Sequence, residues 1–223
     1  MNEQNFTYAH RDTSTPERVS RTAELNKLQV SDRVAALRKG ANAREVPVAD
    51  DETLGFLLSL ARAKGAESIL EVGCAEGVTS LALLEECGGA KLTAIERDGN
   101  FYNAAKLNLL GYGERTSLIF GDANDVLPTL EDGVYDFIFL DCAKVQYVKL
   151  LPHLKRVLKD GGVLLADDVL LYGWVNGEAE VPKKRRMLVE HIREYLAAVT
   201  GDKELRTSVL DIGNGLALSV KLR

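Results

Sequence analysis

The apolar and polar positions divide this chain into two parts that meet near Gly65. Up to that point the apolar residues recur at helical spacing without a strand-like run, which predicts helices only. Beyond it, short apolar runs alternate with helical patterns, which is typical of a parallel sheet covered by helices. The predicted strands are residues 68–72, 91–95, 116–120, 135–140 and 163–166. We therefore expect an α/β fold with a helical appendage at its N-terminus.

Capping residues and helix breakers set the limits of the predicted helices. The helices expected before Gly65 are residues 16–28, Asp32 to Lys39 with a stop at Gly40, and one that begins at Asp50 or Asp51. The later helices are residues 79–87, 99–110, 144–158 and 182–199, with a short turn near 124–130. Pro152 lies inside one of them, and we expect it to divide that helix and to begin the second half.

The C-terminal end predicts a β-hairpin, because the runs Leu205–Leu210 and Leu216–Lys221 flank the turn Ile212–Gly215. The length of 223 residues suits one compact domain, with residues 1–65 as the extension and residues 66–223 as the sheet-containing part. No apolar run approaches the ~18 residues of a membrane span, and the N-terminus has no signal-peptide core. The 3 cysteines lack C-x-x-C spacing, which argues against a disulfide framework or a zinc site. We expect a cytoplasmic protein.

The net charge of −5 argues against a general nucleic-acid binder, but this charge is unevenly distributed. Residues 11–44 contain 8 basic and 4 acidic residues, and residues 181–193 contain 5 basic and 1 acidic residue. Each segment is therefore +4, and the rest of the chain carries −13. The two basic segments are either solvated helix faces or surfaces for an anionic partner.

A glycine-containing turn follows the first predicted strand. Gly73 comes directly after the strand, Gly77 follows four positions later, and a helical pattern opens at Thr79. Ligands of open α/β sheets bind at the carboxyl ends of the strands, where glycines let them approach the backbone. An ordinary strand-to-helix loop is the alternative. The spacing fits neither the dinucleotide fingerprint nor the P-loop.

Two further strand ends carry acidic residues. Glu96 ends the second strand, where a carboxylate accepts hydrogen bonds from ribose hydroxyls, and Asp122 and Ala123 follow the third. This series resembles the S-adenosylmethionine (SAM) site of the Rossmann-like class I methyltransferases over roughly residues 66–221. The resemblance implies a seven-stranded, mostly parallel sheet with an antiparallel last strand. It also implies that SAM contacts Glu71, Gly73, Gly77, Thr79, Glu96, Asp122, Ala123 and Asp141.

Three more carboxylates follow the fourth and fifth predicted strands. Asp141 ends the fourth, with Lys144 three residues on, and Asp167 and Asp168 end the fifth. The first, fourth and fifth strands are neighbours in this topology, so we expect the three carboxylates to converge near the glycine turn. Such a group repels itself unless a cation is bound, and oxygen ligands favour Mg²⁺, Mn²⁺ or Ca²⁺. The alternative is that these aspartates only cap the helices that follow.

This set resembles the cation-dependent O-methyltransferases, the family that includes catechol and caffeoyl-coenzyme A O-methyltransferases. Asp141 and Asp167 match the family's metal ligands, and Lys144 matches its catalytic lysine. Asp168 departs from the family's asparagine, and Val78–Thr79 replaces a Tyr-Ser pair while keeping a hydroxyl for the SAM carboxylate. The resemblance implies that a metal binds the acceptor oxygen and lowers its pKa. Lys144 would take the proton, provided that the metal depresses its own pKa.

The acceptor is predicted from a narrower resemblance. Pro182–Arg186 and Gly213–Ser219 resemble the bacterial tRNA 5-hydroxyuridine methyltransferases, over most of residues 34–221. That branch forms 5-methoxyuridine at the wobble position, which implies that the basic segment contacts phosphates of the tRNA anticodon region. A small catechol or phenolic acceptor is the alternative, and a SAM-binding regulator without catalysis would not need Lys144 and three carboxylates. We also expect a homodimer.

Overall fold

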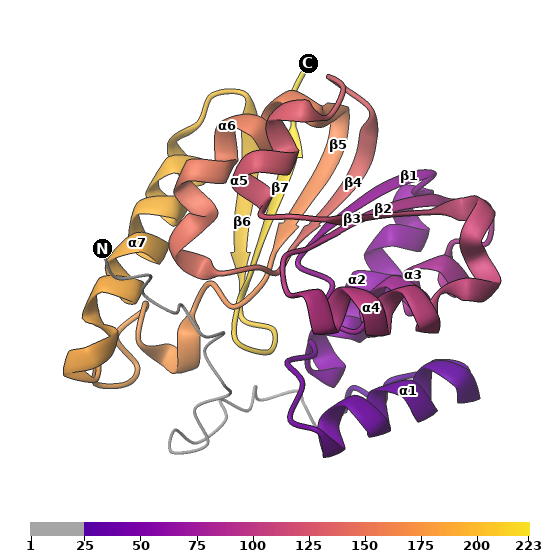
Figure 1. The fold of residues 1–223 in the computed structure, drawn as a ribbon. Coiled ribbons are helices and arrows are strands. Elements are labelled where there is room, and N and C mark those ends of the chain that lie inside the picture. The colour runs from indigo at the N-terminus through magenta and orange to yellow at the C-terminus, as the bar shows by residue number, and fades with distance from the viewer. Residues whose placement is uncertain (1–24) are drawn as a thin grey trace, which may run out of the picture.

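The computed structural model describes residues 25–223, which fold around a sheet of seven strands in the order β3-β2-β1-β4-β5-β7-β6 (Figure 1). The strands are β1 (Ser68–Val72), β2 (Lys91–Glu96), β3 (Thr116–Phe120), β4 (Tyr135–Leu140), β5 (Leu158–Ala166), β6 (Leu205–Leu210) and β7 (Leu216–Lys221). β1 to β5 pair in parallel, whereas β7 pairs antiparallel with both β5 and β6. The predicted Rossmann-like sheet with an antiparallel last strand is confirmed.

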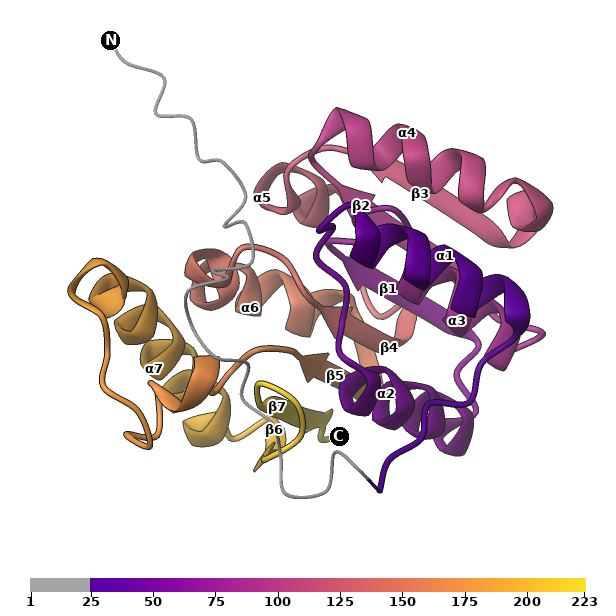
Figure 2. The same ribbon diagram turned by 90° about the horizontal axis from the view of Figure 1, so that it is seen from below.

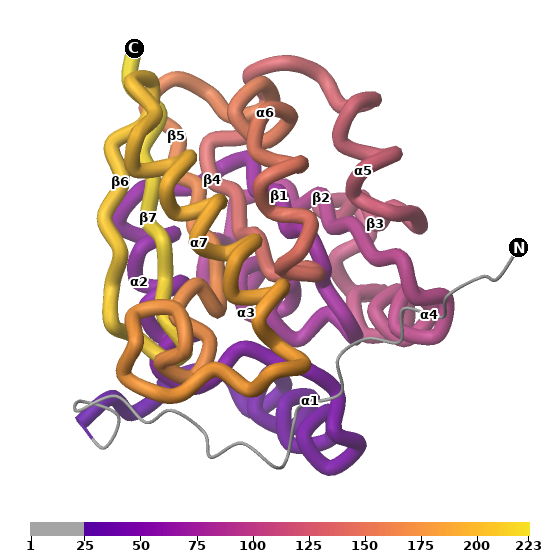
Figure 3. Tube along the Cα trace, turned by 90° about the vertical axis from the view of Figure 1, so that its left-hand side faces the viewer, coloured from indigo at the N-terminus to yellow at the C-terminus, as the bar shows by residue number. Residues whose placement is uncertain are grey.

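Helices cover both faces of this sheet. One face carries α2 (Asp51–Lys64), α3 (Val78–Glu86) and α4 (Gly99–Asn108), and the other carries α5 (Ala123–Val126), α6 (Tyr147–Val157) and α7 (Arg186–Gly201). Figure 3 shows α2 and α6 on opposite sides of the strands. Short 3₁₀ turns are Leu110–Arg115, Leu127–Thr129, Lys144–Gln146, Leu171–Gly173 and Lys183–Arg185. No helix within residues 25–223 is long and apolar enough to cross a membrane.

The central strands are buried on both faces, which explains why they are uninterrupted apolar runs in the sequence. Along β4, Phe137 and Phe139 pack into the core under α2 and α3, whereas Ile138 and Leu140 pack into the core under α6 and α7. All four side chains are fully buried. The site at the ends of these strands therefore rests on a core that is packed from both sides.

The N-terminal helices differ in how they join this core. α2 begins after Asp50, whose carboxylate accepts from Thr53 N at 2.8 Å, and ends at Gly65 in the left-handed conformation, both as predicted. Its side chains Leu54 and Leu57 are fully buried in the core of that face. α2 is therefore part of the helical layer. By contrast, α1 (Asp32–Ala43) packs on α3 and lies across the lower edge of the sheet in Figure 1.

Three predicted boundaries were wrong. α1 continues through Gly40 to Ala43, and the guanidinium of Arg44 lies beside that glycine, 3.3 Å from where a Cβ would be. β5 begins at Leu158 instead of 163, because Leu158 pairs with Tyr135 before an irregularity in the register. Of the helix predicted over 16–28, residues 25–28 are not helical, and the remainder lies outside the described residues.

Pro152 was expected to divide a helix, but α6 runs through it from Tyr147 to Val157. A proline inside a helix costs about 3 kcal/mol, because its ring removes one hydrogen bond and crowds the preceding turn. Leu150 and Leu154 are fully buried on either side of it. Burying each such side chain contributes about 1.5–3 kcal/mol, so packing on the sheet keeps the two halves on one axis.

Candidate active site

The predicted site residues lie at one edge of the sheet, where the parallel strands β1 to β5 end; Figure 2 views the molecule from this side. The residues that follow the strands are Gly73–Gly77 after β1, Glu96 at the end of β2, Asp122 after β3, Asp141 after β4, and Asp167 and Asp168 after β5. We call Gly73–Gly77 the glycine loop. We call Asp141, Lys144, Asp167 and Asp168 the carboxylate–lysine cluster.

The glycine loop is packed between the ends of β2 and β4. Gly73 N donates to Ile95 O at 2.9 Å, and Gly73 has a φ of +89°. A Cβ on Gly73 would lie 2.4 Å from the carbonyl oxygen of Asp141, so no other residue fits there without movement. The loop therefore depends on this glycine both for its backbone conformation and for its contact with the β4 end.

The loop presents the start of α3. Gly77, at a φ of +80°, is the N-cap residue of α3 and provides no side-chain cap. The N–H groups of the first turn have no partner within the helix, which makes such an end suitable for an anionic ligand group. Thr79 lies in this turn and is 7% exposed.

The carboxylates beside the loop are bound by neighbouring groups. Glu96 accepts from Ala75 N and from Asp98 N, both at 2.8 Å, and so links β2 to the glycine loop. Asp122 is partly buried, which raises the pKa of its carboxyl, but hydrogen bonds from Asn124 and Gln146 outweigh this and leave that pKa lowered. Ala123, the next residue, is buried in the first turn of α5.

Glu71 stands out because it is buried inside the strand that precedes the loop. It is 1% exposed and accepts a hydrogen bond from the hydroxyl of Ser80 in α3. Burial, together with the charges of Asp141 and Glu96, raises the pKa of Glu71 to about 8. Its side chain therefore holds a proton at neutral pH.

The carboxylate–lysine cluster has a different arrangement. Lys144 Nζ lies 2.6 Å from Asp141 Oδ1 and 2.8 Å from Asp168 Oδ2, so one ammonium joins the ends of β4 and β5. Asp167 instead accepts from the backbone N of Asp168 at 2.6 Å. Asp168 has a φ of +58°, an uncommon conformation that directs its side chain toward Lys144. The structure thus brings two of the three carboxylates onto a common cation.

Burial and mutual charge shift the pKa values in this cluster upward. Burial raises the pKa of Asp141 and, more strongly, that of Asp167, and the charge of Asp168 adds to both shifts. Burial alone would lower the pKa of Lys144, but the charges of Asp141 and Asp168 raise it well above its ordinary value. Without a metal, Lys144 is therefore an ammonium.

The cluster has the donors for a divalent cation, although they are not arranged as a finished coordination group. Within residues 25–223, no three or more Asp, Glu, His or Cys side chains are placed to hold a metal ion together. The Lys144 ammonium, however, stands between Asp141 and Asp168 at the distances given above. Carboxylate oxygens that already converge on one cation suit Mg²⁺, Mn²⁺ or Ca²⁺ once Lys144 moves aside. The chemistry of the carboxylate–lysine cluster therefore suits a divalent cation.

Tyr147 lies next to the carboxylate–lysine cluster, and no sequence pattern indicated that it would be part of the site. Its hydroxyl lies 2.9 Å from Leu140 O and 3.2 Å from Asp167 O, at the ends of β4 and β5 respectively. The side chain is fully buried. This hydroxyl joins the start of α6 to the two strand ends, which are also paired directly, since Asp167 N donates to Leu140 O at 3.0 Å.

The basic segment predicted from the sequence lies at the same edge. The chain leaves β5 there and returns through α7 to the opposite edge, where β6 begins, so Lys183–Arg186 lie at the end nearest the cluster (Figures 1 and 2). Lys183, Lys184 and Arg186 are exposed. Met187 beside them is 70% exposed. This end of α7 therefore combines basic and apolar surface.

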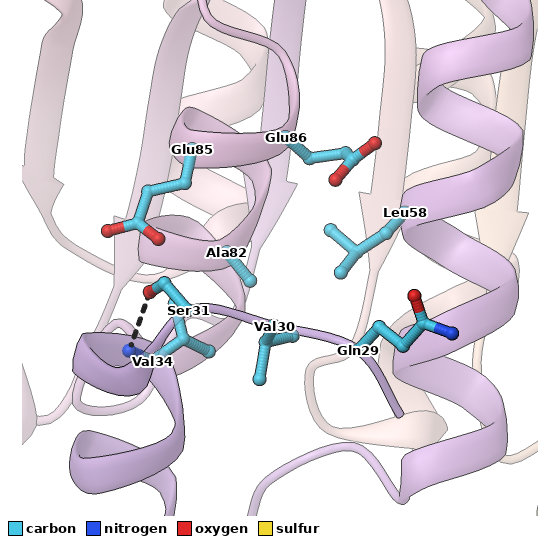
Figure 4. Close-up of a pocket in the computed structure, with 8 residues that line it drawn as sticks. All are labelled: Gln29, Val30, Ser31, Val34, Leu58, Ala82, Glu85 and Glu86. Carbon is cyan, nitrogen blue, oxygen red and sulfur yellow. Dashed lines mark hydrogen bonds between the residues drawn. The ribbon is translucent and has the colours of Figure 1, made fainter. Parts of the chain in front are cut away.

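A separate cleft of about 380 Å³ lies between α1, α2 and α3 (Figure 4). It is lined by Gln29, Val30, Ser31, Val34, Leu58, Ala82, Glu85 and Glu86. Its two acidic residues are at the C-terminal end of α3, away from the strand carboxyl ends. Both have partners, since Tyr112 OH donates to Glu85 and Arg62 pairs with Glu86. The cleft therefore does not belong to the site described above.

Comparison with known proteins gives a consistent result. A model of the O-methyltransferase family matches residues 19–222. Tapetum-specific methyltransferase 1 of Arabidopsis thaliana is 31% identical over 200 residues, covering 85% of this chain and 84% of that protein. The caffeoyl-CoA O-methyltransferase of Populus kitakamiensis is 31% identical over 189 residues, covering 79% and 78%.

Solved structures agree with these relatives. A candidate caffeoyl-CoA O-methyltransferase from Staphylococcus aureus has a TM-score of 0.80 at 32% identity, covering 89% of this chain and 96% of that one. The O-methyltransferase TomG from Streptomyces achromogenes, solved with SAM, has a TM-score of 0.76 at 22% identity, covering 88% and 92%. The second likeness concerns the fold alone.

Proposed function

Because the chain belongs to the O-methyltransferase family, whose enzymes take the methyl group from SAM, we propose that it is a metal-dependent enzyme that methylates 5-hydroxyuridine in tRNA. The product would be 5-methoxyuridine at the wobble position of the anticodon. The observation that carries the chemistry is the ammonium of Lys144 between Asp141 and Asp168 at the strand edge. The observation that favours tRNA is the exposed basic end of α7 at the same edge.

The cofactor half of the proposed site is the glycine loop with its neighbours. We place the carboxylate of SAM at the uncapped first turn of α3, beside Thr79, and the ribose at Glu96. Asp122 and Ala123 would face the adenine. Glu71, Gly73, Gly77 and Asp141 complete the set of proposed SAM-binding residues. Glu96 and Asp122 already have fixed positions through backbone hydrogen bonds, so little reorganisation is needed when SAM binds.

The acceptor half is the carboxylate–lysine cluster, where Asp141, Asp167 and Asp168 would hold Mg²⁺, or Mn²⁺ or Ca²⁺ in its place. A bound divalent cation supplies Lewis acidity, which lowers the pKa of a hydroxyl held there. Lys144 would then leave its position between Asp141 and Asp168, and the charge of the cation would lower the pKa of its ammonium. Once that ammonium had released its own proton to solvent, the neutral Nζ would accept the proton of the acceptor hydroxyl. Tyr147 would keep the start of α6 attached to the two strand ends while Lys144 moves.

The acceptor is proposed from surface charge. Phosphate contacts from lysine and arginine position a nucleic acid without reading its sequence. Lys183, Lys184 and Arg186 are suited to this role because they are exposed at the start of α7, at the same edge of the sheet. A small phenolic acceptor is the second candidate, and it is favoured by the likeness to a caffeoyl-CoA O-methyltransferase. Such an acceptor needs no basic surface.

The deciding experiment supplies SAM, Mg²⁺ and either 5-hydroxyuridine-containing tRNA or a catechol, and measures the methylated product by mass spectrometry. Formation of 5-methoxyuridine supports the tRNA proposal, whereas turnover of the catechol alone overturns it. Neutralising Lys183, Lys184 and Arg186 should raise KM for tRNA and reduce the salt slope of binding by roughly 0.7–0.9 for each phosphate that is no longer bound. The matched control neutralises Lys64, Lys91 and Lys203, which are exposed at the opposite edge and should leave both quantities unchanged.

A further inference from the structure

An arginine from outside the sheet-containing part holds the glycine loop. Arg44 follows α1, and its guanidinium donates from Nε to Glu76 Oε1 at 3.3 Å and from Nη2 to Glu76 Oε2. Glu76 lies inside the glycine loop and its side chain is 10% exposed, whereas that of Arg44 is 55% exposed. A guanidinium that uses two nitrogens for the two oxygens of one carboxylate fixes the orientation of both groups.

The turn that follows α1 places Arg44 for this contact. Glu45 has a φ of +57°, and Val46 N donates back to Ala41 O at 3.0 Å, so the chain reverses directly after the helix. The Arg44 side chain then lies along the last turn of α1, beside Gly40. A Cβ at Gly40 would lie 3.3 Å from Arg44 Nη1, so the absence of a side chain there leaves room for the guanidinium.

Apolar packing joins the same two segments. Ala41, Val46 and Val78 form a small buried cluster, against which Ala75 and Phe101 pack. This cluster connects the end of α1 with the start of α3 across the glycine loop. Arg44 and Glu76 lie beside it, so the ion pair and the apolar contacts restrain the same turn.

We propose that Arg44 and Glu76 are positioning residues for SAM, in which the ion pair keeps the Glu76 carboxylate away from the start of α3. Glu76 directly precedes Gly77, the N-cap residue, and α3 has no side-chain cap. A carboxylate released at that position would itself attract the N–H groups of the first turn and would repel an anionic ligand group there. The proposal rests on the assignment of SAM to the glycine loop and is independent of the acceptor.

The first test measures the SAM dissociation constant by calorimetry in Arg44→Met, Glu76→Gln and the double variant. Arg44→Met leaves a largely buried carboxylate without its partner, so SAM should bind roughly three- to tenfold more weakly. Glu76→Gln removes the ion pair and also the carboxylate charge that would repel the ligand, so it should weaken SAM binding by roughly threefold at most. The double variant should resemble Glu76→Gln, because the two residues act as one unit. In turnover assays, KM for SAM should rise while kcat at saturating SAM stays unchanged.

Arg38→Met is the matched control. Arg38 is also on α1 and binds Asp51 Oδ1 through Nη2 at 2.7 Å and Nε at 3.1 Å, but it contacts α2 and the link before it instead of the glycine loop. Its loss should lower thermal stability without changing SAM affinity. Equal weakening of SAM binding by Arg38→Met and Arg44→Met would mean that both only loosen α1, and this would overturn the proposal.

A second readout does not depend on SAM. Hydrogen exchange of the backbone amides of residues 74–78 should be faster in Arg44→Met than in the wild type and unchanged in Arg38→Met. Arg44→Lys, which keeps the charge but not the paired nitrogens, should be intermediate. Unchanged exchange in Arg44→Met, or effects of the two single variants that simply multiply in the double variant, would also overturn the proposal. If exchange responds as expected but the wild type binds no SAM, the cofactor assignment fails instead.

Discussion

The two halves of the strand edge balance their acidic groups in different ways. Beside the glycine loop each acidic side chain has its own partners: Glu96 accepts from backbone N–H groups, Glu71 from Ser80, and Glu76 from Arg44. At the ends of β4 and β5, by contrast, Asp141 and Asp168 share the single ammonium of Lys144. The acidic groups of the first half have their hydrogen-bond partners before any ligand binds. Those of the second half depend for their charge balance on Lys144, which the proposed chemistry must move.

This difference indicates a division of labour. Fixed hydrogen bonds from the backbone suit a half that binds a cofactor repeatedly in one pose, because little free energy is lost to ordering. A shared cation suits a half in which a metal and a proton acceptor must exchange places. Changes in the cofactor half should therefore act through binding and stability, and changes in the acceptor half through turnover.

Lys144→Met should have the largest effect and should separate the halves most clearly. Removing the proposed proton acceptor should lower kcat by roughly 10²–10⁴-fold, while the SAM dissociation constant stays within about twofold of the wild type. Steady-state kinetics and calorimetry measure the two quantities. Lys149→Met, an exposed lysine on α6, is the matched control and should retain kcat. Equal loss of turnover and SAM binding in Lys144→Met would contradict the division.

Metal removal gives the corresponding test without mutation. Dialysis against EDTA should abolish turnover and leave SAM binding within about twofold, because the glycine loop needs no metal to satisfy its carboxylates. Re-addition of Mg²⁺ should restore activity. Full turnover in EDTA would contradict metal dependence and leave the O-methyltransferase assignment in place.

Glu71→Gln tests the cofactor half through stability. The pKa of Glu71 is raised in the folded protein from 4.5 to about 8, so the folded state binds a proton that the unfolded state has released. This group therefore stabilises the fold least above pH 8, and its contribution declines as pH rises from about 4.5 to about 8. The free energy of unfolding of the wild type, relative to Glu71→Gln, should fall by roughly 3–4 kcal/mol between pH 5 and 8. Urea unfolding at several pH values measures this free energy. If it changed with pH in the same way in the wild type and in Glu71→Gln, the raised pKa of Glu71 would be refuted.

Gly73→Ala tests the joint between the halves. The added Cβ would lie 2.4 Å from Asp141 O, and the φ of +89° is unfavourable for alanine, so unfolding should become easier by about 2–4 kcal/mol. Gly161→Ala is the control, since its φ is +71° but no atom lies within 4 Å of the added Cβ. It should cost only about 1 kcal/mol. Thermal or urea unfolding compares them, and equal losses would show that the contact with the β4 end is unimportant.

Local sequence patterns predicted the sheet well because each strand is specified by its own residues. Leu205–Leu210 and Leu216–Lys221 are the observed β6 and β7, since apolar runs on either side of a glycine-rich turn leave little choice of pairing. The predicted end of α1 was wrong because it depends on a residue far away in the sequence. A glycine usually ends a helix, but Gly40 makes room for the side chain of Arg44, whose partner Glu76 is 32 positions away from it. No pattern along the chain indicates that contact.

The candidate site divides in the same way. The strand-end positions of Glu96, Asp122 and Asp141 followed from the order of strands and loops. The position of Lys144 between Asp141 and Asp168 did not follow from that order, because it depends on the φ of +58° at Asp168 and on the pairing of the ends of β4 and β5. Tyr147 and Arg44 carry no motif, and only the folded chain reveals what they contact.

Asp168→Asn should have the smallest effect and should sharpen the comparison most finely. It introduces the asparagine that the resemblance to cation-dependent O-methyltransferases implies at this position. Asparagine tolerates a positive φ, so the backbone should keep its conformation. The variant removes one of the two charges that hold Lys144, which should make that lysine easier to displace. It also removes one charge from the proposed metal ligands, which should weaken Mg²⁺ binding by roughly tenfold.

The two effects act on different measurements. kcat at saturating Mg²⁺ should stay within about threefold of the wild type, while titration calorimetry should show the weaker metal affinity. Asp168→Ala is the matched control: it removes the same charge, but alanine tolerates the positive φ less well, so it should also lower stability. If Asp168→Asn abolished turnover at saturating Mg²⁺, the carboxylate itself would be needed for chemistry, and its role would not be limited to holding a cation at the ends of β4 and β5.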